Sequence, residues 1–227
     1  MNWGKRLDST IGPNTKIKMI NLVVTSVGDF YNREVLNFMN SEYSKNFKLF
    51  LLTDNPKLFD NPNTTFYYKG VFSYFDKFLF GLKILNQLEE GGFIWDADEL
   101  HTIQTDIDRY DMNDDSIQFA GHWDEYGKFD SILKREPNYW GFFNDLIKSE
   151  NVSYPDFYTI QEDKIWFPKN DYTEFLNCFE GLHIPFIINS IKNGTHKNGV
   201  ANGEGIALGY SIFKTNMKFK SVYNFKN

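Results

Sequence analysis

The feature that most constrains the fold is an alternation of short apolar runs with segments of helical periodicity. The apolar runs end at Gly, Asn, Asp or Pro residues, as strands do, and two intervening segments repeat apolar residues every three or four positions, as helices do. In the first half of the chain, the predicted strands lie at 17–25, 47–53, 64–68 and 92–98, and the predicted helices at about 31–44 and 73–89. This alternation predicts an α/β fold in which a mainly parallel central sheet is flanked by helices.

The second half of the chain is less regular. Predicted strands lie near 117–120 and 157–167, and predicted helices near 137–149, 172–191 and 203–213. Because 227 residues suit one sizeable domain, and no internal repeat or linker divides them, we expect a single domain over 17–227. The polar residues 1–16, which include Gly12-Pro13-Asn14, predict a flexible lead-in.

Composition and charge exclude several classes of protein. Apolar residues make up 41% and charged residues 24% of the chain, which is close to the globular norm and excludes a disordered or fibrous protein. The net charge of -6 argues against a general nucleic-acid-binding protein, which needs a basic face. The single cysteine, Cys178, excludes an internal disulfide. With no hydrophobic leader and no apolar run of about 20 residues, the sequence predicts a cytoplasmic protein without a membrane span.

Two carboxylates, Asp96 and Asp98, follow the apolar run Phe93-Ile94-Trp95. Ligand sites of parallel sheets lie beyond the carboxyl ends of the strands, and Mg²⁺ or Mn²⁺ can be shared there between carboxylates and substrate phosphates. Alternatively, the two residues end the strand and cap the next helix. An EF-hand is disfavoured because the loop lacks Gly and Glu at the required offsets. A haloacid-type phosphatase is disfavoured because its Asp-x-Asp would follow the first strand.

Four segments occur in an order that is typical of one family. They are Val23-Val24-Thr25-Ser26-Val27-Gly28, Leu51-Leu52-Thr53-Asp54-Asn55, Tyr74-Phe75-Asp76-Lys77-Phe78 and Ile94-Trp95-Asp96-Ala97-Asp98. They resemble a first strand that ends on a nucleotide, a second strand that ends in a Thr-Asp turn, a helix with a basic residue, and a strand that runs into Asp-x-Asp. In this order the chain resembles the nucleotide-sugar-dependent glycosyltransferases of the GT-A fold. The resemblance is good for residues 17–100 and loose for the rest of the chain.

The resemblance implies a single GT-A-like, Rossmann-type domain with a nucleotide-binding half at 17–100 and an acceptor-side half at 101–227. It implies a metal-dependent glycosyltransferase whose nucleotide-sugar donor is most often UDP-linked. Asp96 and Asp98 would hold Mn²⁺ or Mg²⁺. The residues that would contact the donor are Thr25, Ser26, Val27, Asp54, Lys77 and Asp96. Two of these have other interpretations, since Lys77 could be a solvated helix lysine and Asp54 could simply turn the chain.

The second half must then supply a site for a carbohydrate or glycoconjugate acceptor. Glu162 and Asp163 begin a predicted strand at a place where glycogenin-like members of the family contact donor and acceptor. Glu204 lies between Gly203 and Gly205 at the predicted start of a helix, where the glycines would let a substrate approach and leave the carboxylate exposed. Glu204 is therefore the candidate catalytic residue. The alternative is that its charge stabilises the helix N-terminus.

Two further residues and a second function complete these expectations. Tyr31 either stacks on the base or packs in the core. By resemblance to the glycogenin-like group, His196 would be a third metal ligand. The alternative function is a non-catalytic carbohydrate-binding or scaffold protein that retains the fold and binds sugar through its aromatic residues, without metal. The sequence leaves the donor sugar, the acceptor and the stereochemistry of transfer open.

Overall fold

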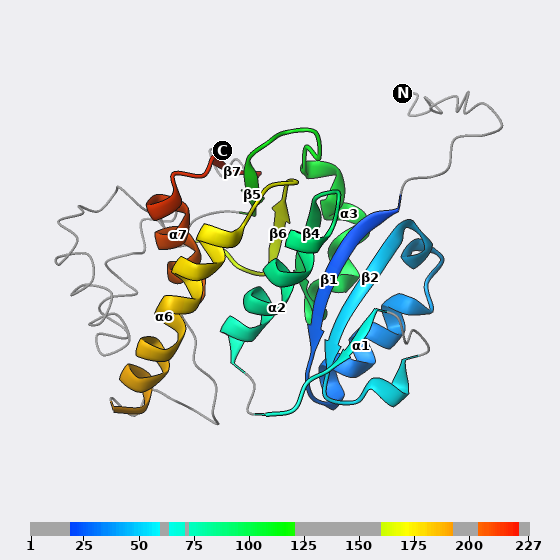
Figure 1. Cartoon of the computed structure of the whole chain (residues 1–227). Helices are drawn as coiled ribbons and strands as arrows, with labels where there is room; N and C mark the ends of the chain where they lie inside the picture. Colours follow the sequence, from blue (N-terminus) through cyan, green and yellow to red (C-terminus); the bar gives the residue numbers. More distant parts are fainter. Residues whose placement is uncertain (1–18, 60–63, 71–72, 121–159, 193–203, 223–227) are drawn as a thin grey trace, which may run out of the picture.

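The computed structural model describes residues 19–59, 64–70, 73–120, 160–192 and 204–222 (Figure 1). The strands of these ranges are β1 (Ile20–Ser26), β2 (Phe47–Thr53), β3 (Thr65–Tyr67), β4 (Gly92–Asp96), β5 (Ile117–Phe119), β6 (Lys164–Phe167) and β7 (Phe219–Ser221). The α-helices are α1 (Asp29–Met39), α2 (Tyr74–Gln87), α3 (Ile103–Asp106), α6 (Thr173–Lys192) and α7 (Glu204–Thr215). Short 3₁₀ helices are η1 (Glu42–Asn46), η2 (Pro56–Leu58), η3 (Ala97–Thr102) and η4 (Ile107–Arg109).

The strands form one mixed sheet in the order β3-β2-β1-β4-β6-β5-β7. β1 pairs in parallel with both β2 and β4, and β2 pairs in parallel with β3. β6 runs antiparallel to both of its neighbours, β4 and β5, whereas β5 and β7 are parallel to each other. Among the strands that the structure describes, only β6 is therefore reversed, and the sheet is mostly parallel.

Helices cover both faces of the sheet, as Figure 1 shows. The face beneath α2, α6 and α7 includes Val23 of β1, and the opposite face, beneath α1 and the segment 97–109, includes Leu22 and Val24. Successive strand residues point to opposite faces, so the continuous apolar run of β1 is what burial on both faces requires. The α/β class, with a mainly parallel sheet flanked by helices, is confirmed.

Several predicted boundaries shift in the structure. The predicted strand 47–53 agrees with β2 at both ends, whereas β1 begins at Ile20. The predicted helix 31–44 is wrong beyond Met39, because the chain leaves α1 and the Ser41 side chain caps the 3₁₀ helix η1. The strand expected near 157–167 is shorter, since β6 begins at Lys164.

Some elements were not predicted, and some predictions lie outside the described residues. The helical turns of 97–109 and the short edge strand β7 have no clear period in the sequence. The lead-in 1–16 and the helix near 137–149 fall outside the described ranges. Within those ranges, no helix combines the length and apolar character needed to cross a membrane.

Candidate functional site

A pocket of about 330 Å³ opens at the edge of the sheet where β1 and β4 end. The described residues that line it come from the ends of these strands and the turns that follow them, from the starts of α1, α2 and α7, and from the segment before β6. They are Thr25, Val27, Tyr31, Tyr74, Lys77, Asp96, Ala97, Asp98, Glu162 and Glu204. Most of the residues predicted from the sequence therefore meet in one place.

The reversed direction of β6 brings Glu162 to this pocket. Because β4 and β6 are antiparallel and Trp95 pairs with Lys164, the residues just before β6 lie beside the residues at the end of β4. The backbone N–H of Asp96 donates a hydrogen bond of 2.8 Å to the carbonyl of Asp163, which extends this pairing to the edge of the pocket. A parallel strand would place its first residues at the opposite edge of the sheet.

Lys77 lies inside α2 and is buried, with 3% of its surface exposed. A capping box starts the helix, in which Ser73 Oγ accepts from the Phe75 N–H and Asp76 Oδ2 accepts from the Ser73 N–H at 2.8 Å. Lys77 Nζ lies 2.5 Å from Asp96 Oδ1 and donates to the Glu162 carbonyl at 3.1 Å. The interpretation of Lys77 as a solvated helix lysine is wrong.

The charges around Lys77 shift the pKa values of the site. Burial lowers the pKa of Lys77, but the carboxylates of Asp96, Glu204 and Glu162 outweigh this effect and leave the pKa raised. Burial raises the pKa of Asp96 to about 6, although the ammonium of Lys77 opposes the shift. The pKa of Glu162 rises to about 8, because the group is buried and lies near the carboxylate of Glu204.

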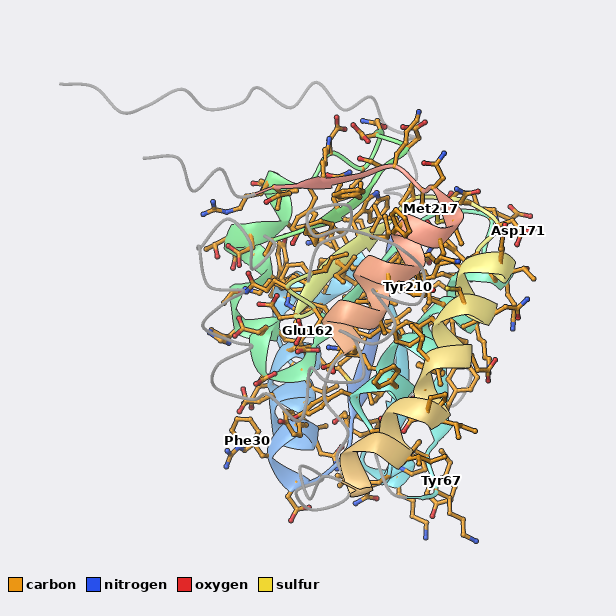
Figure 2. The ribbon with its side chains drawn as sticks, turned by 90° about the vertical axis from the view of Figure 1, so that its left-hand side faces the viewer. Phe30, Tyr67, Glu162, Asp171, Tyr210 and Met217 are labelled. Carbon is orange, nitrogen blue, oxygen red and sulfur yellow. The ribbon has the colours of Figure 1, made fainter. Side chains whose placement is uncertain are left out.

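Glu204 is the first residue of α7 and lines the pocket, but it is only 4% exposed. The expectation of an exposed carboxylate is therefore wrong, because α7 packs closely against the segment before β6. The Ile160 N–H donates to the Gly205 carbonyl at 3.1 Å, and a Cβ on Gly205 would lie 2.3 Å from the Ile160 carbonyl oxygen and 2.8 Å from Glu162 Oε2. Figure 2 shows Glu162 beside the first turn of α7. Gly205 thus permits the approach of protein groups.

Asp98 is exposed and lines the same pocket as Asp96. Among the described residues, no group of three or more His, Cys, Asp or Glu side chains could hold a metal ion by itself. Mg²⁺ is commonly bound by one or two carboxylates together with substrate phosphates. Asp96 and Asp98 therefore fit a divalent metal that a phosphate-bearing ligand helps to hold. His196, the predicted third ligand, lies outside the described residues.

Of the three residues at the end of β1 that were predicted to contact the nucleotide-sugar, Thr25, Ser26 and Val27, two line the pocket. Thr25 and Val27 line it, and Thr25 Oγ1 is buried with no hydrogen-bond partner among the described residues. Ser26 points elsewhere, because its buried hydroxyl donates to Asn32 Oδ1 at 2.7 Å. Thr25 is thus the residue of this strand end whose polar atom the described residues leave without a partner.

Asp54 and Asp163 do not line the pocket. The carboxylate of Asp54 accepts hydrogen bonds of 3.0 Å from the Gly28 N–H and from Asn32 Nδ2, so it fixes the turns after β1 and β2. Asp163 accepts from Gln161 Nε2 at 3.1 Å through one carboxylate oxygen. The structure therefore gives Asp54 the turn role and leaves the Asp163 carboxylate outside the described pocket lining.

Two tyrosines complete the lining. Tyr31 lies in the first turn of α1, and its hydroxyl lies near that of Tyr74. Burial and this contact raise the pKa of Tyr74 to about 12. Tyr74 was not among the predicted site residues. The available signal was its position three residues before Lys77, close to one helical turn.

Comparisons with known proteins give no match: no model of a protein family matches the chain, and no curated protein or solved structure does. The function is therefore inferred from the chemistry and geometry of the pocket.

Proposed function

We propose that this protein is a metal-dependent glycosyltransferase with a GT-A-like arrangement. It would transfer a sugar from a nucleotide-sugar donor, for which UDP-linked sugars are the first choice, to a carbohydrate or glycoconjugate acceptor. The observation that carries the proposal is that Asp96 and Asp98 share one pocket with Lys77, Glu162 and Glu204. These residues come from segments far apart in the chain, and they converge at the strand edge where α/β sheets bind ligands.

The charge of the pocket supports a requirement for metal. Its described lining contains four carboxyl groups and one ammonium, and the ammonium of Lys77 is already bound to Asp96. Even with Glu162 protonated, as its raised pKa favours at neutral pH, three carboxylates outnumber the ammonium. A diphosphate that enters such a pocket is repelled unless a cation accompanies it. When bound by Asp96, Asp98 and the donor phosphates, Mn²⁺ or Mg²⁺ would supply Lewis-acid stabilisation of the leaving diphosphate.

The chain's own residues then have distinct roles in the proposed reaction. Thr25 and Tyr31 would contact the nucleotide, one through its hydroxyl and the other through its ring. Glu204 would act at the reacting sugar or at the acceptor hydroxyl, because it lies in the same pocket on the acceptor-side half. Lys77 would hold Asp96 and the Glu162 backbone in place.

A thermal-shift screen tests this proposal. Wild-type protein would be melted with UDP-, GDP- and CMP-sugars, each with Mn²⁺ and with EDTA. A ligand at about 100 times its Kd stabilises the folded state by about 2.7 kcal/mol, so a clear rise in Tm is expected for one donor class with Mn²⁺ only. A shift given by free sugars and independent of Mn²⁺ would support the non-catalytic carbohydrate-binding alternative and contradict the proposal.

A further inference from the structure

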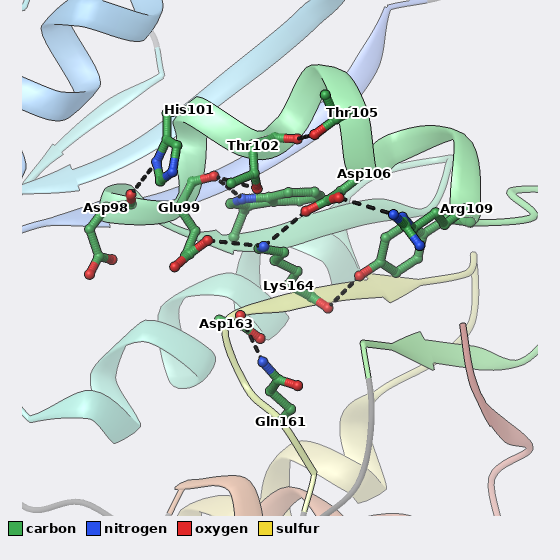
Figure 3. Close-up of polar contacts among 12 residues, drawn as sticks. Asp98, Glu99, His101, Thr102, Thr105, Asp106, Arg109, Gln161, Asp163 and Lys164 are labelled. Carbon is green, nitrogen blue, oxygen red and sulfur yellow. Dashed lines mark hydrogen bonds and ion pairs between the residues drawn. The ribbon is translucent and has the colours of Figure 1, made fainter. Parts of the chain in front are cut away.

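Lys164, the first residue of β6, is a second buried lysine near the pocket, with 7% of its surface exposed. Its Nζ lies 2.9 Å from Glu99 Oε2 and 2.9 Å from Asp106 Oδ2 (Figure 3). The side chain of Asp106 is 11% exposed and that of Glu99 is 35% exposed. One ammonium thus bridges two carboxylates of the segment that follows β4.

Glu99 is covalently next to Asp98, and several contacts hold its position. Its carbonyl oxygen accepts hydrogen bonds of 3.0 Å from Trp95 Nε1 and from Thr102 Oγ1. Its side chain reaches Lys164. The turn that carries Asp98 is therefore held by three contacts: with Trp95 of β4, with Thr102 at the end of η3 and with Lys164 of β6.

Lys164 is also close in the chain to Glu162, which lines the pocket. It follows Glu162-Asp163 directly, and its carbonyl accepts a hydrogen bond of 2.9 Å from the Tyr110 hydroxyl. Lys164 therefore joins the chain segment that supplies Asp98 to the segment that supplies Glu162 (Figure 3).

We propose that Lys164 is a positioning residue that fixes the Asp98 carboxylate relative to Asp96 by holding Glu99. This inference rests on the proposed function, because it concerns the metal that Asp96 and Asp98 would share. Metal coordination tolerates errors of only about 0.2 Å, and groups that orient metal ligands are typically worth 10- to 100-fold in metal affinity. Asp98 itself is exposed, so the anchoring of its turn sets the backbone position from which its carboxylate reaches the pocket.

The experiment measures Mn²⁺ binding in the presence of saturating UDP, with free Mn²⁺ followed by electron paramagnetic resonance. Lys164→Met removes the bridging ammonium. Glu99→Ala removes only the partly exposed carboxylate of the bridge, so the inference can still be tested if Lys164→Met fails to fold. Lys220→Met is the control, because Lys220 of β7 makes a more exposed ion pair of 2.7 Å with Asp114, outside the pocket lining.

We expect Mn²⁺ affinity to fall at least 10-fold in Lys164→Met and at least 3-fold in Glu99→Ala, and to stay unchanged in Lys220→Met. A purely structural role predicts a lower Tm with unchanged Mn²⁺ affinity in the folded variants, and this result would overturn the inference. A wild-type protein that binds neither Mn²⁺ nor UDP would instead contradict the proposed function, and the inference would fall with it.

Discussion

Lys77 Nζ lies 2.5 Å from Asp96 Oδ1, and it also donates to the Glu162 carbonyl. The basic residue that the sequence predicts near the donor is thus bound to the protein itself, through one carboxylate and one backbone carbonyl. Burial of an ammonium is costly unless partners compensate it, and here two chain segments supply the partners. Lys77 is an internal counter-ion of the pocket.

Lys77→Met should destabilise the protein even without ligand. The substitution leaves Asp96 without its cation beside Glu162 and Glu204, and breaking a buried pair in this way costs roughly 3 kcal/mol. Urea unfolding with EDTA present measures the change. The control is Lys83→Met in the same helix, whose pair with Glu180 is half-exposed and is worth about 0–1 kcal/mol. Equal losses of unfolding free energy in the two variants would show that the buried Lys77 pair stabilises the protein no more than the exposed Lys83 pair.

Asp98→Asn should remove the metal-dependent part of nucleotide binding. The amide keeps the shape of the exposed side chain but loses the charge that would ligate Mn²⁺, so the Tm without ligand should hardly change. Calorimetric titration with UDP, with Mn²⁺ or with EDTA, gives the two affinities. Asp108→Asn, at an exposed position outside the lining, controls for the loss of one negative charge. Metal-dependent binding that survives in Asp98→Asn excludes Asp98 as a ligand.

Glu162→Gln should change how stability depends on pH. Between the ordinary pKa of 4.5 and the raised value of about 8, folded protein retains a proton on Glu162 that the unfolded chain has released. The group therefore makes stability fall as pH rises through this range. The variant lacks this effect, so its stability relative to wild type should increase from pH 5 to pH 8 in urea unfolding with EDTA.

The control for that experiment is Glu174→Gln, at an exposed position of α6, which removes the same formal charge. A difference between Glu162→Gln and wild type that is the same at both pH values would refute the raised pKa.

Glu204→Gln separates a catalytic role from a structural one. A transition-state role predicts that turnover falls about 100-fold or more while donor affinity changes little. Stabilisation of the α7 N-terminus predicts a loss of only about 0.3–1 kcal/mol in stability with turnover retained. Donor hydrolysis and Tm, measured on the same samples, distinguish the two. Normal turnover with lowered stability would assign Glu204 to the helix.

The sequence carries part of this site in local patterns. The apolar run Phe47–Thr53 has the length of a strand and is followed by Asp54-Asn55-Pro56, which end strands. It agrees with β2 at both ends. Asp96 and Asp98 are predicted to lie at the ligand-binding edge of the sheet, because they follow an apolar run in a chain where strands alternate with helices. These features depend on a few neighbouring residues, which is why they can be predicted.

Long-range relationships are not contained in such patterns. The burial of Lys77 depends on Asp96, which lies 19 positions away. The direction of β6 decides that Glu162 faces the pocket, and no periodicity encodes strand direction. Gly205 was expected to admit a substrate, whereas in the structure the Ile160 carbonyl and the Glu162 carboxylate approach it.

The most direct measurement is the release of nucleoside diphosphate from nucleotide-sugars, followed with Mn²⁺ and with EDTA. Wild-type protein should release the nucleotide from one donor class with Mn²⁺, faster when its acceptor is present. EDTA and Asp98→Asn should each abolish the release, because the leaving diphosphate would lose its metal. Release that continues unchanged in EDTA, or no release from any UDP-, GDP- or CMP-sugar with Mn²⁺, would contradict a metal-dependent glycosyltransferase.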